Sequence, residues 1–188
     1  MNKIEIVIIF ILIVFVLFYV QKKYLEVEYV TSSVDNQKYL VQNRKNKKKA
    51  ANMLARLDDK ITRLIDHVYK KDSVLTQLLK DNYVSENISE GTDDTKYTSY
   101  SVNKGEQLVF CLRSRDNADK FVEENVLMYV ATHELAHLMT SDIGHTPLFW
   151  ENFKYLLNEA VNINVYTKTN YAESPIDYCG INIKSSII

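Results

Sequence analysis

Three of the four histidines in this 188-residue chain, His133, His137 and His145, lie in one short stretch, ATHELAHLMTSDIGH. Residues four apart on an α-helix are separated by about 40° around the axis and about 6 Å along it, so His133 and His137 can face one ion. Glu134 is rotated by about 100° from His133, which keeps it out of the ligand set but within reach of a water on that ion. The spacing therefore predicts a helical metal site with a carboxylate base beside it.

We expect the metal to be zinc, because two helical histidines with an intervening glutamate are the arrangement of zinc peptidases, in which the glutamate is the general base. Zinc lowers the pKa of a bound water to about 7. Such a site needs a third protein ligand and keeps one position open. His145 is the first choice, because Gly144 before it can adopt a positive φ and let the chain turn back toward the helix. Glu159 is the second choice and Asp142 the third.

Other polar residues form weaker patterns. Four tyrosines could each donate a hydrogen bond to an oxyanion, although packing roles are expected in a chain with 13 tyrosines: Tyr100, Tyr166, Tyr171 and Tyr178. His67 lies near an apolar helical stripe and is expected to be a structural histidine. The cysteines, Cys111 and Cys179, match no metal or redox spacing, so two buried thiols and one disulfide both remain open.

An uncharged apolar run extends from Ile6 to Gln21, IVIIFILIVFVLFYVQ. As a helix it would span about 24 Å, a little short of the ~30 Å hydrocarbon core of a bilayer. Lys3 and Lys22–Lys23 can reach the headgroups and cover the difference. A cleaved signal peptide is disfavoured, because no Ala or Gly precedes Ala50. We expect an uncleaved single-pass anchor, with residues 4–23 in the lipid bilayer.

The flanking charges favour one orientation of that anchor. More lysines and arginines follow the span than precede it, which places the C-terminal part on the cytoplasmic side of the membrane. The expected organisation is an anchor over residues 1–23, a juxtamembrane connector over 24–36 in which a short strand is possible, and one domain over 37–188. The formal net charge of −1 gives no basic field, so we expect no nucleic-acid partner.

The first part of the domain is expected to be helical. No Gly or Pro occurs from Gln37 to Lys71, and apolar residues recur there every three or four positions: Ala50, Leu54, Leu57, Ile61, Leu64 and Val68. This pattern predicts an amphipathic helix with one core-facing stripe. The basic run Arg44–Lys49 is expected to be a solvated face, with attraction to anionic lipid as the alternative. Ser73 is the expected N-cap of a second short helix, and the polar stretch 82–94 reads as a loop.

Strands are expected next. Residues 97–102 and 107–113 are rich in strand-forming residues, and Asn103-Lys104-Gly105 between them supplies turn residues for a hairpin. The histidine helix should begin near Asn125 and end near Thr140.

A last helix is predicted from Thr146-Pro147, an N-cap followed by proline at the first helical position, to about Asn162. The tail after Val165 is expected to be irregular or extended. Together these elements indicate an α+β fold, with helices packed on a small antiparallel sheet, the histidine helix behind it, and an N-terminal transmembrane helix.

The pattern HELAH…GH…FW resembles the WLM and SprT-like zinc metallopeptidases, whose fold is zincin-like. The resemblance covers about Tyr97 to Glu159. It implies that His133, His137 and His145 bind zinc, that Glu134 is the catalytic base, and that Phe149 and Trp150 are a packing pair. The stretch SEGTDDTKYTSYSVNKGEQLVFCLRS and the later YCGI resemble a membrane-anchored WLM-type group of large DNA viruses.

The chain departs from the family in three respects. Its loop from His137 to His145 is longer than usual, it has an apolar N-terminal span, and it shows no DNA-binding module. A role in DNA repair is therefore not expected.

The predicted function is that of a membrane-tethered zinc endopeptidase acting on proteins or peptides. Strand 107–113 would offer its edge to an extended substrate. The alternative is a membrane-anchored structural protein, such as a virion component, whose zinc stabilises a non-catalytic domain.

Overall fold

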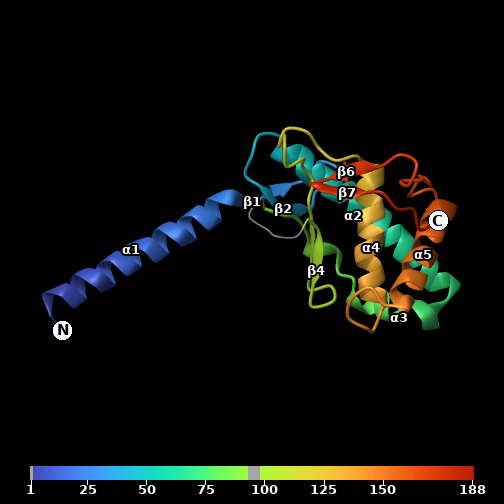
Figure 1. Ribbon diagram of the computed structural model, residues 1–188, viewed down its shortest axis with the longest axis horizontal. Coiled ribbons are helices and arrows are strands. Elements are labelled where there is room, and N and C mark those ends of the chain that lie inside the picture. Colours follow the sequence, from blue (N-terminus) through green and yellow to red (C-terminus); the bar gives the residue numbers. More distant parts are fainter. Residues whose placement is uncertain (1, 93–97) are drawn as a thin grey trace.

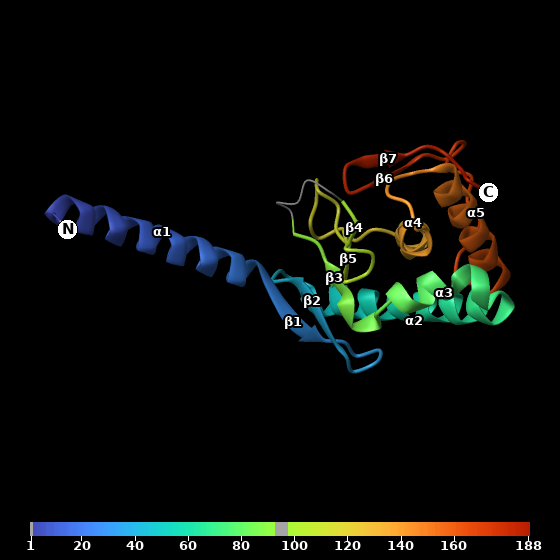
Figure 2. The ribbon, with the colours of Figure 1, turned by 90° about the horizontal axis from the view of Figure 1, so that it is seen from below.

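A computed structural model describes residues 2–92 and 98–188, apart from the side chains of residues 22–25 (Figure 1). Helix α1 (Lys3–Glu26) projects away from the rest of the protein (Figures 1 and 2). It starts with a capping box, in which Asn2 and Glu5 each accept a hydrogen bond of 2.8 Å from the other's backbone N–H. The part from Lys3 to Gln21 is long and apolar enough to cross a membrane, and none of it is buried in the protein. A helix is therefore present where the anchor is predicted.

The described residues form a five-stranded sheet with the order β1-β2-β3-β5-β4. Its strands are β1 (Val27–Thr31), β2 (Lys38–Gln42), β3 (Ile88–Glu90), β4 (Tyr100–Val102) and β5 (Gln107–Phe110). The β1–β2 and β4–β5 pairs are antiparallel, whereas β2–β3 and β3–β5 are parallel. The prediction of an antiparallel sheet was thus wrong. Two helices connect β2 to β3, and a crossover of this kind is what brings parallel strands together.

Two of these strands were not predicted. Strand β2 lies just before the basic run, in a stretch whose lack of Gly and Pro suggested helix, and β3 lies inside the predicted loop 82–94 after a short 3₁₀ turn, Ser85–Asn87. Strand β3 has only three residues, all buried, and therefore no visible alternation of apolar and polar residues. The possible strand in the predicted connector is present as β1, an edge strand of the sheet among the described residues.

Helices α2 (Lys47–Lys71) and α3 (Ser73–Asn82) pack together beside the sheet (Figure 2). The predicted apolar stripe of α2 faces the core and is at most 3% exposed: Ala50, Leu54, Leu57, Ile61, Leu64 and Val68. The basic run is largely exposed, as expected for a solvated face. The N-cap of α3 is Asp72 rather than Ser73. The Asp72 carboxylate accepts a hydrogen bond of 2.9 Å from the backbone N–H of Leu75, so the helix begins at the serine.

Helices α4 (Glu124–Met139) and α5 (Pro147–Asn162) complete the core. Helix α4 contacts α2, α3, α5, β4 and β5, and most of its residues are buried. The predicted bounds of both helices are confirmed to within a residue or so. The side chain of Thr146 accepts a hydrogen bond of 3.4 Å from the N–H of Phe149, and Pro147 occupies the first turn.

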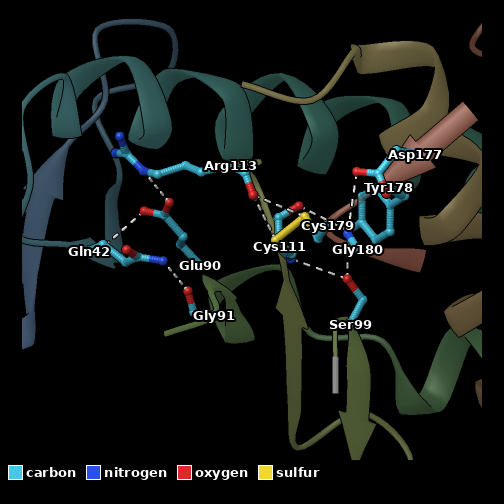
Figure 3. The surroundings of a disulfide bond; sticks show 10 residues. All are labelled: Gln42, Glu90, Gly91, Ser99, Cys111, Arg113, Asp177, Tyr178, Cys179 and Gly180. Atoms are coloured by element: carbon cyan, nitrogen blue, oxygen red, sulfur yellow. Dashed lines mark hydrogen bonds and ion pairs between the residues drawn. A yellow bond between two sulfur atoms is a disulfide. The ribbon is translucent and has the colours of Figure 1, made fainter. Parts of the chain in front are cut away.

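The C-terminal tail contains a hairpin that the sequence did not reveal. Strands β6 (Ile176–Tyr178) and β7 (Ile181–Ile183) are joined by Cys179 and Gly180, which both have positive φ angles, as a two-residue hairpin turn requires. Cys179 forms a disulfide with Cys111, at the end of β5 (Figure 3). Both sulfur atoms lie 3.1 Å from the carbonyl oxygen of Arg113. Sulfurs joined in a disulfide carry no hydrogen, so these are S···O contacts. The bridge fastens the hairpin to the sheet.

Candidate metal centre

The C-terminal half of α4 brings two of the predicted ligands to one place. His133 and His137 lie one turn apart, with ring centroids separated by 5.0 Å. His145 approaches from the following loop, and its ring centroid is 4.8 Å from that of His133 and 4.9 Å from that of His137. One nitrogen of each of these rings lies within 4.8 Å of the others, and the Nε2 atoms of His133 and His145 are 3.0 Å apart. The structure thus gathers the histidines into one cluster.

The loop to His145 begins at Thr140, where the backbone becomes extended and α4 ends. The buried hydroxyl of Thr140 donates to the carbonyl of Ala136 at 2.7 Å and accepts from the side-chain N–H of Asn152 on α5 at 2.9 Å. Gly144 has a φ of +85°, and a Cβ placed there would meet nothing within 4 Å. The glycine is therefore favoured by the backbone angle and not by a lack of space.

The β4–β5 turn holds the same end of α4 from another side. The ammonium of Lys104 donates to the carbonyls of Thr140, at 3.0 Å, and of Ser141. Gly105 has a φ of +112°, and a Cβ there would lie 2.0 Å from the carbonyl oxygen of Asn82. Only glycine fits this position. Because a cation at a helix C-terminus also interacts favourably with the helix dipole, the turn stabilises the end of α4 from which His137 projects.

Aromatic rings of α5 pack under the histidines. The centroid of Phe149 lies 4.9 Å from that of His133, 4.3 Å from that of His137 and 4.6 Å from that of His145. The ring centroid of Trp150 lies 5.5 Å from that of His145. These contacts restrict the imidazole rotamers and keep water from one side of the cluster, so the two aromatics predicted as a packing pair contact the predicted ligands themselves.

The electrostatics of the cluster favour neutral imidazoles. Burial, together with the neighbouring His137 and His145, lowers the pKa of His133 to about 3. Burial and the proximity of His145 also lower the pKa of His137. A neutral imidazole has the free lone pair that a metal needs. The three rings fit zinc, since Zn–N bonds of about 2.0–2.1 Å place tetrahedral ligand nitrogens roughly 3.3 Å apart, which small ring rotations would reach.

Glu134 lies next to the cluster and is 6% exposed. Burial raises the pKa of its carboxyl to about 7, although a hydrogen bond from the backbone of Ser101 on β4 acts in the opposite direction. The carboxylate is therefore oriented by the sheet, and its proton affinity suits a group that gains and loses a proton near neutral pH.

Comparisons with known proteins identify the family of this chain. Residues 33–180 match the WLM domain family model. The chain belongs to the WLM family. It is 34% identical to uncharacterized protein R325 of Acanthamoeba polyphaga mimivirus, over 94% of this chain and 92% of that protein. It is also 33% identical to uncharacterized protein 136R of Invertebrate iridescent virus 6, over 38% of this chain and 40% of that protein. Relatives thus occur in viruses, and membership of this family points to metallopeptidase-like chemistry.

The crystal structure of Wss1 from Saccharomyces cerevisiae has a similar fold. It aligns with a TM-score of 0.50 and 20% sequence identity, over 66% of this chain and 88% of Wss1. This likeness supports the mixed α+β architecture of the WLM domain.

The two alternative third ligands, Glu159 and Asp142, are not part of the histidine cluster. Glu159 is bound by His67, with Nε2 to Oε2 at 2.8 Å, and by the ammonium of Lys71 at 2.6 Å. His67 is thus a hydrogen-bonded structural histidine, as predicted. Asp142 is exposed in the loop before His145.

The tyrosines considered for an oxyanion role are mainly packing residues. Tyr166 and Tyr171 are at most 3% exposed, and Tyr100 is half-buried in β4. Tyr178 lies beside Glu134 but is already bonded: its hydroxyl donates to the carbonyl of Cys111 at 2.9 Å and lies 2.6 Å from the hydroxyl oxygen of Ser99 (Figure 3).

A pocket of about 320 Å³ opens beside the cluster. It is lined by Thr98, Ser99, Tyr129, Val130, His133, Glu134, Tyr178, Ile181 and Ile183. These residues come from α4, from the segment before β4 and from the β6–β7 hairpin. Sequence reasoning missed the contribution of the hairpin, because only the folded chain brings a three-residue strand near the C-terminus to a helix in the middle. The pair of cysteines was a signal that could have placed the hairpin next to the end of β5, on the same side of the pocket.

Proposed function

We propose that this WLM protein is a membrane-anchored, zinc-dependent endopeptidase. The observation that carries the proposal is the convergence of His133, His137 and His145, together with the pocket that His133 and the adjacent Glu134 line. The three imidazoles would hold zinc and leave one position open. Zinc bound there would act as a Lewis acid and lower the pKa of a water.

Glu134 supplies the proton chemistry. Its carboxylate accepts a proton from the water that attacks the scissile carbonyl carbon. The same group then gives this proton to the amide nitrogen as the C–N bond breaks, so the nitrogen leaves as a neutral amine. Burial of the Glu134 carboxyl favours its neutral form, which helps it to hold the proton between the two steps.

The substrate strand must pass along a free sheet edge. Strand 107–113 was predicted to offer that edge, and this was wrong, because β5 is paired with β3 on one side and β4 on the other. Among the described residues the free edge near the site belongs to β4, and the backbone of Ser101 on β4 already bonds to Glu134. An extended peptide added along β4 would therefore pass the catalytic carboxylate.

Membrane attachment is proposed from α1. Its apolar side chains have no protein partner, since none of the span from Lys3 to Gln21 is buried, and exposing them to water would be costly. The larger number of lysines and arginines after the apolar span favours a cytoplasmic position of the domain. The disulfide argues in the other direction, because disulfides are more common in oxidising compartments. Protease protection of the domain in sealed membrane vesicles decides the side on which it lies.

The Glu134→Gln variant tests the proposed peptidase function. The substitution removes a base and leaves the three imidazoles in place, so zinc content and melting temperature should stay close to wild type while cleavage falls by at least about 10²–10⁴-fold. The measurement compares peptide termini in the native membrane or particle between wild type and Glu134→Gln. Identical termini, with normal zinc content in both, would contradict the proposal and support the structural alternative.

A further inference from the structure

We infer that the pocket beside Glu134 selects substrates by accepting one large apolar side chain, such as Leu, Ile, Met or Phe, from a residue that flanks the scissile bond. This inference rests on the proposed peptidase function, and it names a substrate preference that the metal cluster alone does not provide.

The chemistry of the pocket wall favours an apolar occupant. Tyr129 and Val130 of α4 form one side, and Ile181 and Ile183 of the hairpin form the other. The charged or titratable groups among the lining residues, apart from the tyrosines, are His133 and Glu134, which belong to the metal cluster. A substrate carboxylate or ammonium buried against these apolar walls would lose hydration, and the charged groups that line the pocket already serve the metal cluster, so a charged occupant is disfavoured.

The pocket has room for a large side chain. Its volume of about 320 Å³ is at the lower end of the ~300–1,000 Å³ range of pockets that hold drug-sized ligands, so a large side chain can enter it without crowding. Successive side chains of an extended peptide point to opposite sides and are about 3.3 Å apart along the chain. Because Glu134 and His133 themselves line the pocket, the residue that enters it must be next to the bond attacked by the water that Glu134 deprotonates.

The wall opposite α4 is held in place rather than loosely apposed. The hydroxyl of Ser99 accepts a hydrogen bond of 3.2 Å from the N–H of Cys111, and the Tyr178 hydroxyl bonds to both residues. The adjacent disulfide joins Cys179 to the same cysteine (Figure 3). On the α4 side, the Tyr129 ring packs edge-on against Tyr171, with centroids 5.1 Å apart. A pocket with fixed walls discriminates by shape, because little ordering is needed when the side chain enters.

Binding to zinc-loaded Glu134→Gln protein tests this inference without turnover. The probes are fluorescent pools of otherwise random peptides whose central residue is fixed as Leu, Ala or Glu. Burial of the leucine side chain predicts that the Leu pool binds about 10- to 150-fold more tightly than the Ala pool. Equal affinities for the Leu and Ala pools would overturn the inference.

A charge introduced at the rim of the pocket provides a second test of the inference. Ile181 is 51% exposed, so Ile181→Lys should fold normally while placing an ammonium at the pocket. In the Glu134→Gln background this change should remove the preference for Leu and favour the Glu pool. The matched control is Val74→Lys on α3, at a 90% exposed valine outside the pocket, which should leave all three affinities unchanged. An unchanged preference in Ile181→Lys would also overturn the inference.

Cleavage by the wild-type protein separates the two proposals. Termini next to large apolar residues are expected, and a wild-type cleavage profile without such a preference would contradict the pocket assignment. If the wild type cuts no pool while Glu134→Gln binds the Leu pool selectively, the peptidase proposal fails and the pocket assignment stands.

Discussion

Helices α1 and α4 are both rich in apolar residues and lack a broad polar face, yet they meet opposite surroundings. In α1 the apolar side chains are exposed, for example Leu12 at 57%, whereas Leu135 in α4 is completely buried. An all-round apolar helix needs an apolar environment on every side. Helix α4 finds it in the protein, and α1 would find it in a bilayer.

This difference between α1 and α4 explains why the polar residues within α4 indicate a functional site. A polar side chain inside a core either forms hydrogen bonds within the protein or serves a functional site. Thr132 bonds to the carbonyl of Met128 at 2.8 Å, His133 and His137 belong to the histidine cluster, and Glu134 lines the pocket beside it. In α1 the polar residues are confined to the ends of the apolar span. Polar groups in the middle of an apolar helix therefore mark the site, and polar groups at its ends mark the boundary of a span.

The largest expected effect is on the histidine cluster. His133→Ala and His145→Ala should each weaken zinc binding by more than the roughly 10–100-fold typical of losing an outer-shell partner, whereas Glu159→Ala should leave it nearly unchanged. The reason is that Glu159 is bonded to His67 and Lys71. Zinc stoichiometry and competition with a chelator measure this. A larger loss in Glu159→Ala than in His145→Ala would move the third ligand to α5.

Arginine substitutions test the difference between the two helices directly. Leu135→Arg would bury an unpaired charge and should cost more than about 4 kcal/mol, enough to unfold the domain. Leu12→Arg should leave the melting temperature of the domain unchanged in detergent but weaken membrane retention, because a mid-bilayer arginine costs about 2.5–3.5 kcal/mol on insertion scales. Wild-type protein should resist alkaline carbonate extraction. Release of the wild type, or a mature N-terminus beyond residue 23, would indicate a cleaved signal instead of an anchor.

Removing the disulfide should have the next largest effect. The bridge closes a loop with a sequence separation of 68 residues, for which the chain-entropy model gives about 4 kcal/mol. Cys111→Ser with Cys179→Ser should lower stability by roughly this amount and loosen the hairpin that carries Tyr178 into the pocket. Thermal melts with and without reductant provide the measurement. Reductant should destabilise wild type but not the double variant, and equal sensitivity of the two proteins would contradict this reading.

The difference between local and long-range information explains what the sequence could predict. The bounds of α4 and α5 follow from apolar spacing, Thr146 and Pro147, and the β4–β5 turn follows from Asn103 and Gly105, because such signals lie within a few residues of the structure that they cause. The sheet was harder. Strands β2 and β3 are short and pair in parallel through a helical crossover, so no local pattern specifies their register.

The candidate site divides in the same way. The spacing of His133, Glu134 and His137 is a property of one helix and was visible at once. The contacts of Ser101 with Glu134 and of Lys104 with the end of α4 were not visible, because each joins segments more than 30 residues apart. Such supporting contacts depend on the tertiary fold and leave no periodic trace in the sequence.

The smallest predicted effect concerns one of those contacts. Lys104→Met removes the ammonium that bonds to the carbonyls of Thr140 and Ser141 but retains most of the side-chain length. Because the group is only partly buried, water can replace it, and the expected loss of stability is about 1 kcal/mol. The carbonyls also begin the loop to His145, so zinc affinity should fall by less than about tenfold while the melting temperature falls slightly. Lys168→Met, at an exposed lysine, is the control and should change neither quantity. If Lys104→Met matched this control in both stability and zinc affinity, the β4–β5 turn would have no part in holding the metal loop, and α5 alone would position His145.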